Sequence, residues 1–216
     1  MRSRKRTPRG SLRTALIDAA AMSIAEKGVE ALSVAELTRR LGVSGSAPYQ
    51  HFATRRALLA ATAAQTGRQL ATDMRAAVKK AATRADPGCN ATEALAATAA
   101  AYVRFVARHR VGFDFVFAEH LTVLHHRELA EGGRAVMDVL LPLTLAVADG
   151  PTTALRLLDQ HIAAAHGLGS LYTAGFARSS DLEAVAAAAA QVTRTLAAAA
   201  QRGCASTPIT TAAVAS

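Results

Sequence analysis

The stretch Leu41-Gly42-Val43-Ser44-Gly45-Ser46-Ala47-Pro48-Tyr49-Gln50-His51-Phe52 decides the fold of this chain. Gly42 has no Cβ and can take the positive φ that a sharp turn needs. Ser44 is placed to cap a short helix that runs to His51, with Pro48 near enough to the first turn to be tolerated. A turn followed by a short helix is therefore predicted.

A second helix is predicted just before this turn. Ser33-Val34-Ala35-Glu36 forms a capping box, in which the hydroxyl of Ser33 and the carboxylate of Glu36 satisfy free amide donors at the start of a helix. That helix would bury Val34, Leu37 and Leu41 and end at Gly42. Two short helices joined by a glycine-containing turn have the geometry of a helix-turn-helix.

A longer amphipathic helix is expected upstream, from Ser11 to Lys27. Its apolar residues Leu12, Leu16, Ala20 and Ile24 recur every four positions, and Gly28 follows as a stop signal. Residues 11–56 would thus form a three-helix DNA-binding domain.

The last of these three helices would face DNA. Small residues at its start let the backbone approach phosphates and base edges closely, Tyr49 and His51 can donate to phosphates, and Gln50 is suited to read a base. Arg55 and Arg56 follow in the first turn of the next helix, where a phosphate would relieve their conflict with the helix dipole, or where they are merely solvated. The predicted DNA-binding residues are Ser33, Arg39, Ser44, Gly45, Ser46, Pro48, Tyr49, Gln50, His51 and Arg55.

Positive charge is concentrated in the same region. The net formal charge is +9, and residues 1–56 hold 11 of the 25 Lys and Arg residues against 4 of the 16 acidic ones. Residues 1–10 have the composition of a flexible basic arm, which is either a solvated tail or an arm that follows phosphates or enters a minor groove. This distribution favours a polyanionic partner.

The whole chain is predicted to be all-α, because its Val, Ile and Thr residues never form alternating runs bounded by turns. About nine helices are expected, with a helical domain over residues 57–203 and a disordered tail over 204–216. Beyond the DNA-binding domain, helices are predicted over 56–84, 92–109, 111–124, 128–147, 152–174 and 181–202.

Residues 11–60 resemble the DNA-binding segment of the tetracycline-repressor (TetR) family. The quoted stretch, Arg55, and Leu58-Leu59 match that family's turn, recognition helix and entry to the fourth helix, and Glu26-Lys27-Gly28 also matches. Two departures are visible: Gly45 stands where relatives often have Lys or Arg, and Arg55 replaces a common Lys. Farther along, His166-Gly167-Leu168, Leu171 and Gly175 resemble a subgroup named for a Trp, a His and a Gly (WHG), although this sequence has no Trp.

The resemblance implies a homodimeric transcriptional repressor that binds a near-palindromic operator and is released by a small apolar effector. It also implies a four-helix interface made by the last two long helices of each subunit. Apolar stripes fit that interface or an ordinary intradomain core: Leu155, Leu158, Ile162 and Leu168, then Val185, Ala189, Val192 and Leu196. The residues leave open an activator on the same scaffold and a nonspecific DNA-binding protein.

An effector pocket is expected where most of the aromatic residues gather, between residues 102 and 137. The same aromatic residues could instead be plain core. Arg104 and His109 lie nearby in sequence, as does Phe115. The candidate ligand-binding residues are Tyr102, Phe105, Phe113, Phe117, His120, Met137 and His166.

No catalytic signature is present: the sequence lacks a G-x-S-x-G elbow, a P-loop, an H-E-x-x-H motif and a G-x-G-x-x-G loop. We therefore predict that the chain is not an enzyme and needs no cofactor. His161 and His166 do not share a helical face well, so no metal site is predicted. Cys89 and Cys204 lie far apart without a C-x-x-C motif, and no window reads as a signal peptide or membrane span, which fits a cytoplasmic protein.

Overall fold

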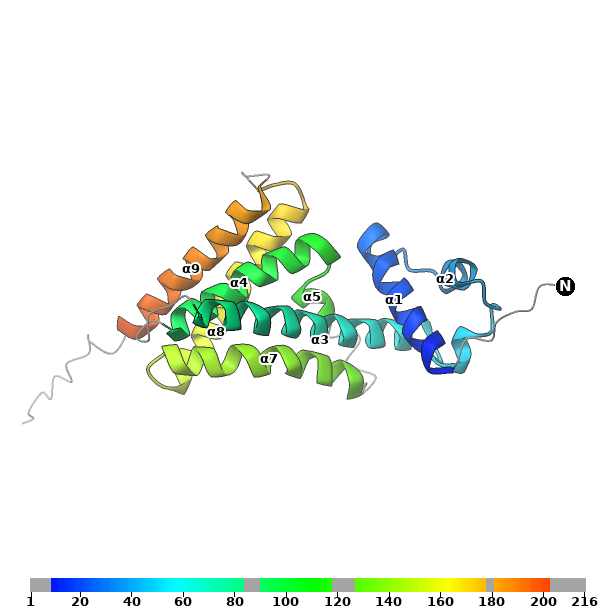
Figure 1. Ribbon diagram of the computed structural model, residues 1–216, viewed down its shortest axis with the longest axis horizontal. Helices are drawn as coiled ribbons and strands as arrows, with labels where there is room; N and C mark the ends of the chain where they lie inside the picture. The colour runs from blue at the N-terminus through cyan, green and yellow to red at the C-terminus, as the bar shows by residue number, and fades with distance from the viewer. Residues whose placement is uncertain (1–8, 84–89, 118–126, 178–180, 203–216) are drawn as a thin grey trace, which may run out of the picture.

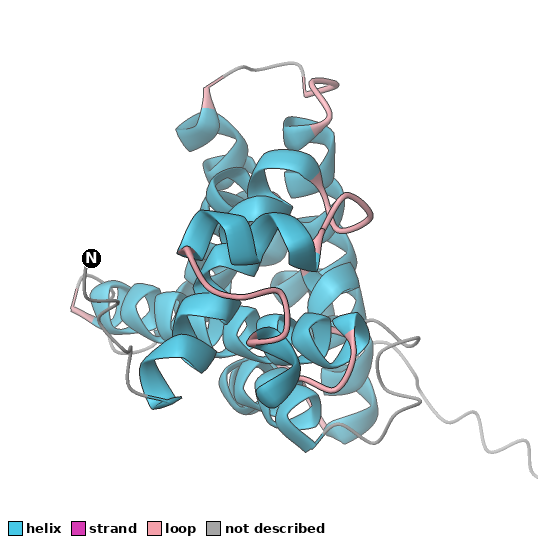
Figure 2. Ribbon diagram, turned by 90° about the vertical axis from the view of Figure 1, so that its right-hand side faces the viewer, coloured by secondary structure: helices cyan, strands magenta, loops and turns pink. Residues whose placement is uncertain are grey.

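The computed structural model describes residues 9–83, 90–117, 127–177 and 181–202 (Figure 1). Within these ranges the chain forms eight α-helices and one 3-10 helix, and no strand, so the all-α prediction is confirmed (Figure 2). The predicted arm 1–10 lies outside the described residues except for Arg9 and Gly10, which already belong to the first helix. The predicted tail 204–216 also lies outside them.

The helices follow the periodicity of the sequence closely. They are α1 (Arg9–Lys27), α2 (Val34–Leu41), η1 (Pro48–Gln50), α3 (Arg55–Ala82), α4 (Asn90–His109), α5 (Phe113–Val116), α7 (Arg127–Val147), α8 (Pro151–Thr173) and α9 (Leu182–Arg202). Of the helix predicted over 111–124, the described part holds only the single turn α5. Arg110 adopts a φ of 58° directly after α4, and this separates the two helices.

Two apolar cores lie along one long helix. The N-terminal core gathers Leu16, Ile24 and Leu37 around the start of α3, including Leu58. The C-terminal core is larger and packs α4, α7, α8 and α9 around the rest of α3, from Leu70 onward. Figure 1 shows α3 running from the small α1 and α2 unit into this larger bundle.

Helix α3 can join both cores because it is capped and internally satisfied. The hydroxyl of Thr54 accepts from the Ala57 amide at 3.1 Å and caps the helix. Thr62 and Thr66 are buried, and each donates its hydroxyl to the carbonyl four residues earlier, at 2.8 and 2.9 Å. The helix is continuous from Arg55 to Ala82, so it runs from the N-terminal core into the C-terminal core.

Candidate DNA-binding site and effector region

The turn after α2 has the predicted form. The hydroxyl of Ser33 accepts from the Glu36 amide at 3.4 Å and caps α2. Gly42 takes the left-handed conformation, with φ 64° and ψ 29°, and its amide donates to carbonyls of the preceding turn. A side chain with a Cβ would be strained here, so the glycine fixes where α2 ends.

Residues 44–51 differ from the predicted α-helix. The backbone hydrogen bonds here run from an amide to the carbonyl three residues earlier, from Ala47 to Ser44 and from Gln50 to Ala47. Only Pro48–Gln50 form a 3-10 turn. Pro48 has no N–H, so the bond that an α-helix would send from this position to Ser44 cannot form. The predicted cap is also wrong, because the Ser44 hydroxyl pairs with the Ser46 hydroxyl at 3.3 Å and the 3-10 turn has no side-chain cap.

This segment still presents polar side chains to solvent. Ser44, Gly45, Ser46 and Gln50 are exposed, and Tyr49 is 58% exposed although it is a large aromatic residue. His51 is half-buried.

Pro48 does not share this exposure. It is buried beneath the segment, close to the core residue Phe52, so its assignment to the DNA-facing surface does not fit the structure. Pro48 shapes the segment and holds it against the domain, because its ring fixes φ and its side chain packs inward.

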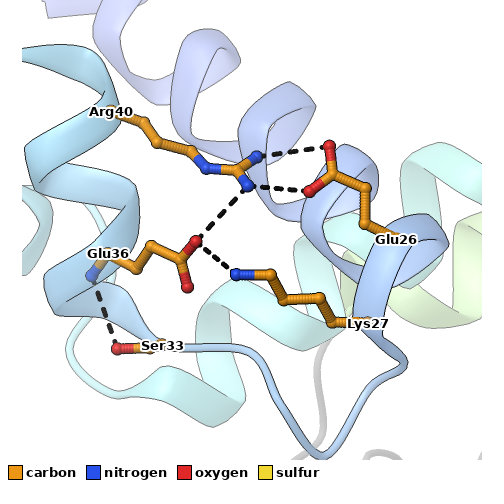
Figure 3. A network of polar contacts seen from close by, with 5 residues as sticks. All are labelled: Glu26, Lys27, Ser33, Glu36 and Arg40. Atoms are coloured by element: carbon orange, nitrogen blue, oxygen red, sulfur yellow. Dashed lines mark hydrogen bonds and ion pairs between the residues drawn. The ribbon is translucent and has the colours of Figure 1, made fainter.

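An ion-pair network holds α2 against the end of α1 (Figure 3). Arg40 bridges Glu26 at 2.7 Å and Glu36 at 3.3 Å, and the Lys27 ammonium lies 2.6 Å from Glu36. The hydrogen bond from Lys27 lowers the pKa of Glu36, and that from Arg40 lowers the pKa of Glu26. Within the capping box the Glu36 carboxylate therefore serves this network, and only the Ser33 half forms as predicted.

The sequence reasoning missed this network. The Glu36 and Arg40 spacing of four residues on one helix was an available signal. Pairing with α1 could not be found in the same way, because Glu26 and Arg40 meet only after the turn between the helices has formed.

Arg55 has a structural partner that the sequence did not indicate. Its guanidinium donates to the carbonyls of Leu32 at 2.9 Å, Val29 at 2.8 Å and Glu30 at 3.2 Å, in the loop between α1 and α2. These contacts neither require nor use a phosphate. Arg39 is exposed and makes no ion pair with another described residue, so it is the cation of α2 that remains open to a partner.

Four of the candidate effector residues lie together. Tyr102, Phe113 and His166 meet: the Tyr102 ring stacks on Phe113 with centroids 4.2 Å apart, and its hydroxyl lies 2.8 Å from the His166 Nδ1. Phe117 extends this group, with its ring centroid 5.9 Å from that of Phe113, and is 40% exposed.

Phe105 and Met137 lie elsewhere. The Phe105 ring lies tilted against the His109 ring, with centroids 4.2 Å apart, and Phe105 borders a surface pocket of about 290 Å³ between α3 and α4. Met137 packs against the C-terminal core, and Phe115 lies in the N-terminal core. His120 lies outside the described residues.

His161 is buried in a neutral environment. Its Nε2 lies 3.2 Å from the Thr98 hydroxyl and its Nδ1 3.1 Å from the Thr193 hydroxyl. Burial lowers the pKa of His161 to about 4. Among the described residues, no group of three or more His, Cys, Asp or Glu side chains is placed to hold a metal ion.

The N-terminal part of the chain matches a known family. Residues 16–62 match the model of the bacterial regulatory proteins of the tetR family. The N-terminal domain is a TetR-family domain. The match covers most of α1, all of α2, the exposed segment 44–51 and the start of α3, and it supports a DNA-binding regulator.

Solved structures share the fold over most of the chain. A protein of unknown function from Rhodococcus sp. RHA1 is 28% identical with a TM-score of 0.68, over 90% of this chain and 98% of that one. SCO4454, a TetR-family transcriptional regulator from Streptomyces coelicolor, is 18% identical with a TM-score of 0.63, over 88% and 96%. The multidrug binding protein EbrR, solved with imidazole, is 22% identical with a TM-score of 0.54, over 83% and 93%.

Other comparisons add less to the family assignment. No curated protein matches the chain. The matches name no subgroup for the C-terminal domain, so the WHG resemblance stays a prediction. None of the helices in the described ranges is long and apolar enough to cross a membrane.

Proposed function

We propose that this chain is a homodimeric transcriptional repressor that binds a near-palindromic operator and is released by a small apolar effector. The observation that carries the proposal is the exposed, polar segment 44–51, held by the αL turn at Gly42 on a TetR-family domain. An exposed Tyr49 beside Gln50 offers donors to phosphates and base edges. Each subunit would place this segment in a major groove.

A homodimer is supported by apolar side chains that the single chain leaves uncovered. Leu155 on α8 is 54% exposed and Val192 on α9 is 39% exposed. Other members of the same stripes, such as Leu158 and Val185, are already buried inside the chain. The stripes thus serve the intradomain core in part, and the remaining exposed leucine and valine would be covered by a second copy.

Effector binding is supported by the aromatic group of Tyr102, Phe113 and Phe117 with the imidazole of His166. Flat apolar rings beside the hydroxyl of Tyr102 and the imidazole of His166 suit a small apolar molecule that carries a hydrogen-bonding group. Release of DNA requires that the effector bind better to the chain in its released form than in its DNA-bound form.

The test is a binding selection from fragmented DNA of the source genome, followed by sequencing of the retained fragments. A shared inverted repeat would support a sequence-specific dimer. Retention that depends on salt without any shared motif would instead indicate nonspecific binding and overturn the proposal.

A substitution then locates the contact. Tyr49→Ala should weaken binding to a retained fragment by about tenfold, because it removes a donor to DNA from a surface position. Phe176→Ala is the control, since Phe176 is an exposed aromatic residue three positions after the end of α8. If the two variants bind alike, the segment 44–51 is not the DNA-reading surface.

A further inference from the structure

The short segment around α5 contacts both cores. Val111 and Phe115 are buried in the N-terminal core, with Leu16 and Leu58. Phe113, which lies between them, is buried in the C-terminal core. Besides α3, this segment is therefore a second physical connection between the TetR-family domain and the helical bundle.

Tyr102 on α4 holds this segment in place. Its hydroxyl accepts from the Phe113 amide at 2.9 Å, its ring stacks on the Phe113 ring, and its residue is fully buried. On the other side the same hydroxyl lies 2.8 Å from the Nδ1 of His166 on α8. One oxygen thus joins α4, α8 and the α5 segment.

The Tyr102 hydroxyl has the groups needed to serve both neighbours. Its oxygen accepts from the Phe113 amide, and the hydroxyl can also form the 2.8 Å hydrogen bond to the His166 Nδ1. The other ring nitrogen of His166, Nε2, lies 3.5 Å from the Ser170 hydroxyl. Burial raises the pKa of Tyr102, and the phenol keeps the proton that this arrangement uses.

Gly112 fits this arrangement because it has no side chain. A Cβ at this position would run into the Tyr102 hydroxyl, although the backbone there, with φ −140°, is one that other residues adopt. Glycine is therefore needed at this position because the Tyr102 hydroxyl leaves no room for a Cβ, and not because of the backbone conformation.

We propose that Tyr102 is a positioning residue for DNA binding, whose hydroxyl fixes the segment 111–116 and through it the TetR-family domain on the helical bundle. Its side chain touches no DNA. The expected effect on DNA affinity rests on the proposed function. The role of the Tyr102 hydroxyl in holding segment 111–116 does not.

Amide hydrogen exchange on the full chain without DNA tests the contact directly. Tyr102→Phe keeps the ring and removes the hydroxyl, and exchange of the Phe113 amide should become roughly five- to tenfold faster. Tyr172→Phe is the matched control, since the Tyr172 hydroxyl has no hydrogen bond to a described residue, and it should leave segment 111–116 unchanged. Unchanged exchange in Tyr102→Phe would overturn the proposal.

A double substitution separates this contact from a general loss of packing. Gly112→Ala alone should speed exchange over 111–116, because its Cβ displaces the hydroxyl. In the Tyr102→Phe background the same substitution should add less, because the nearest obstructing atom is gone and the next ones, Asp114 Oδ1 and His166 Nδ1, lie 3.3 Å away. Equal effects of Gly112→Ala in both backgrounds would contradict the assigned role.

The DNA readout uses a fragment retained in the selection. Tyr102→Phe should bind it roughly tenfold more weakly while Tyr172→Phe binds as the wild type. Faster exchange with unchanged DNA affinity would overturn the positioning role. If the wild-type chain retains no DNA at all, the proposed function fails, and the exchange data still decide whether the hydroxyl fixes the segment.

Discussion

His161 is a buried histidine whose surroundings suit only its neutral form. It is fully buried, and its two ring nitrogens face the hydroxyls of Thr98 on α4 and Thr193 on α9. Burial alone lowers the pKa of His161, and no charged side chain contributes to the shift. Protonation would place an uncompensated charge where three helices meet.

We expect stability to fall as the pH is lowered from about 6.5 toward 4, because the unfolded chain takes up a proton at His161 that the folded chain refuses. The contribution is complete above the unfolded pKa. Between pH 7.5 and 5 the loss should be about 2 kcal/mol, measured by urea unfolding. His161→Gln should flatten this dependence. His51→Gln, which removes a histidine outside the core, should not, and equal profiles for both variants would contradict the assignment.

Single residues were predicted well from the sequence where their partners are close in the chain. The caps at Ser33 and Gly42 depend on neighbours a few positions away, and both appear as expected. Arg55 bonds to carbonyls more than twenty residues earlier, and Tyr102 meets a histidine 64 residues later. Such contacts depend on how helices cross, which a pattern of residue types does not contain.

Helices α3 and α7 pack with their backbones unusually close together. A Cβ on Gly67 would lie 2.7 Å from the backbone oxygen of Gly132, and a Cβ on Gly132 would lie 2.6 Å from the Cα of Ala64. The obstructing atoms belong to the backbone and cannot rotate away. The two helices can therefore keep this crossing only while both positions are glycine.

Gly67→Ala should destabilise the chain by about 1–3 kcal/mol, because the backbone of α7 has to move to admit the methyl group. Gly167→Ala on α8 is the matched control: a Cβ there would meet nothing within 4 Å, and alanine is the better helix former. The control should be more stable by about 0.5–1 kcal/mol. Thermal unfolding followed by circular dichroism measures both, and a shift of the same sign for the two variants would refute the close crossing.

Long helices were predictable because their apolar residues repeat over several turns. The helix predicted over 152–174 is found as Pro151–Thr173, and that over 181–202 as Leu182–Arg202. The segment 44–51 was too short to show a period, and Pro48 decided its conformation by removing a donor. Short elements depend on such single positions, so the sequence pattern predicted their place in the chain but not their type.

At the scale of the whole molecule, residues from the predicted C-terminal domain complete the core of the N-terminal one. The predicted boundary at residue 56 falls at the start of α3, yet the N-terminal core takes Leu58 and Leu59 from α3, Val111 and Phe115 from the α5 region, and Leu129 from α7. Leu129 lies more than seventy residues beyond the predicted boundary. Packing at this distance was outside the reach of a division based on composition and motifs.

Charge on the TetR-family domain is divided between paired and open cations. Glu26, Lys27, Glu36 and Arg40 together carry no net charge, because two carboxylates meet two cations. The neighbouring Arg39 is exposed outside this network. Two adjacent arginines on one helix thus differ, because Arg40 is paired within the domain and Arg39 is exposed.

The salt dependence of DNA binding should distinguish these two arginines. Arg39→Ala removes a cation that can displace a counterion from a phosphate, so the slope of log K against log salt should become shallower by about 0.9 between roughly 50 and 200 mM salt. Arg40→Ala should leave the slope nearly unchanged, because its charge is already balanced by Glu26 and Glu36. Fluorescence polarisation with a labelled genomic fragment gives both slopes, and circular dichroism confirms that both variants are folded. If Arg40→Ala lowers the slope as much as Arg39→Ala does, the network does not withhold Arg40 from the phosphates, and the division of charge on this surface is wrong.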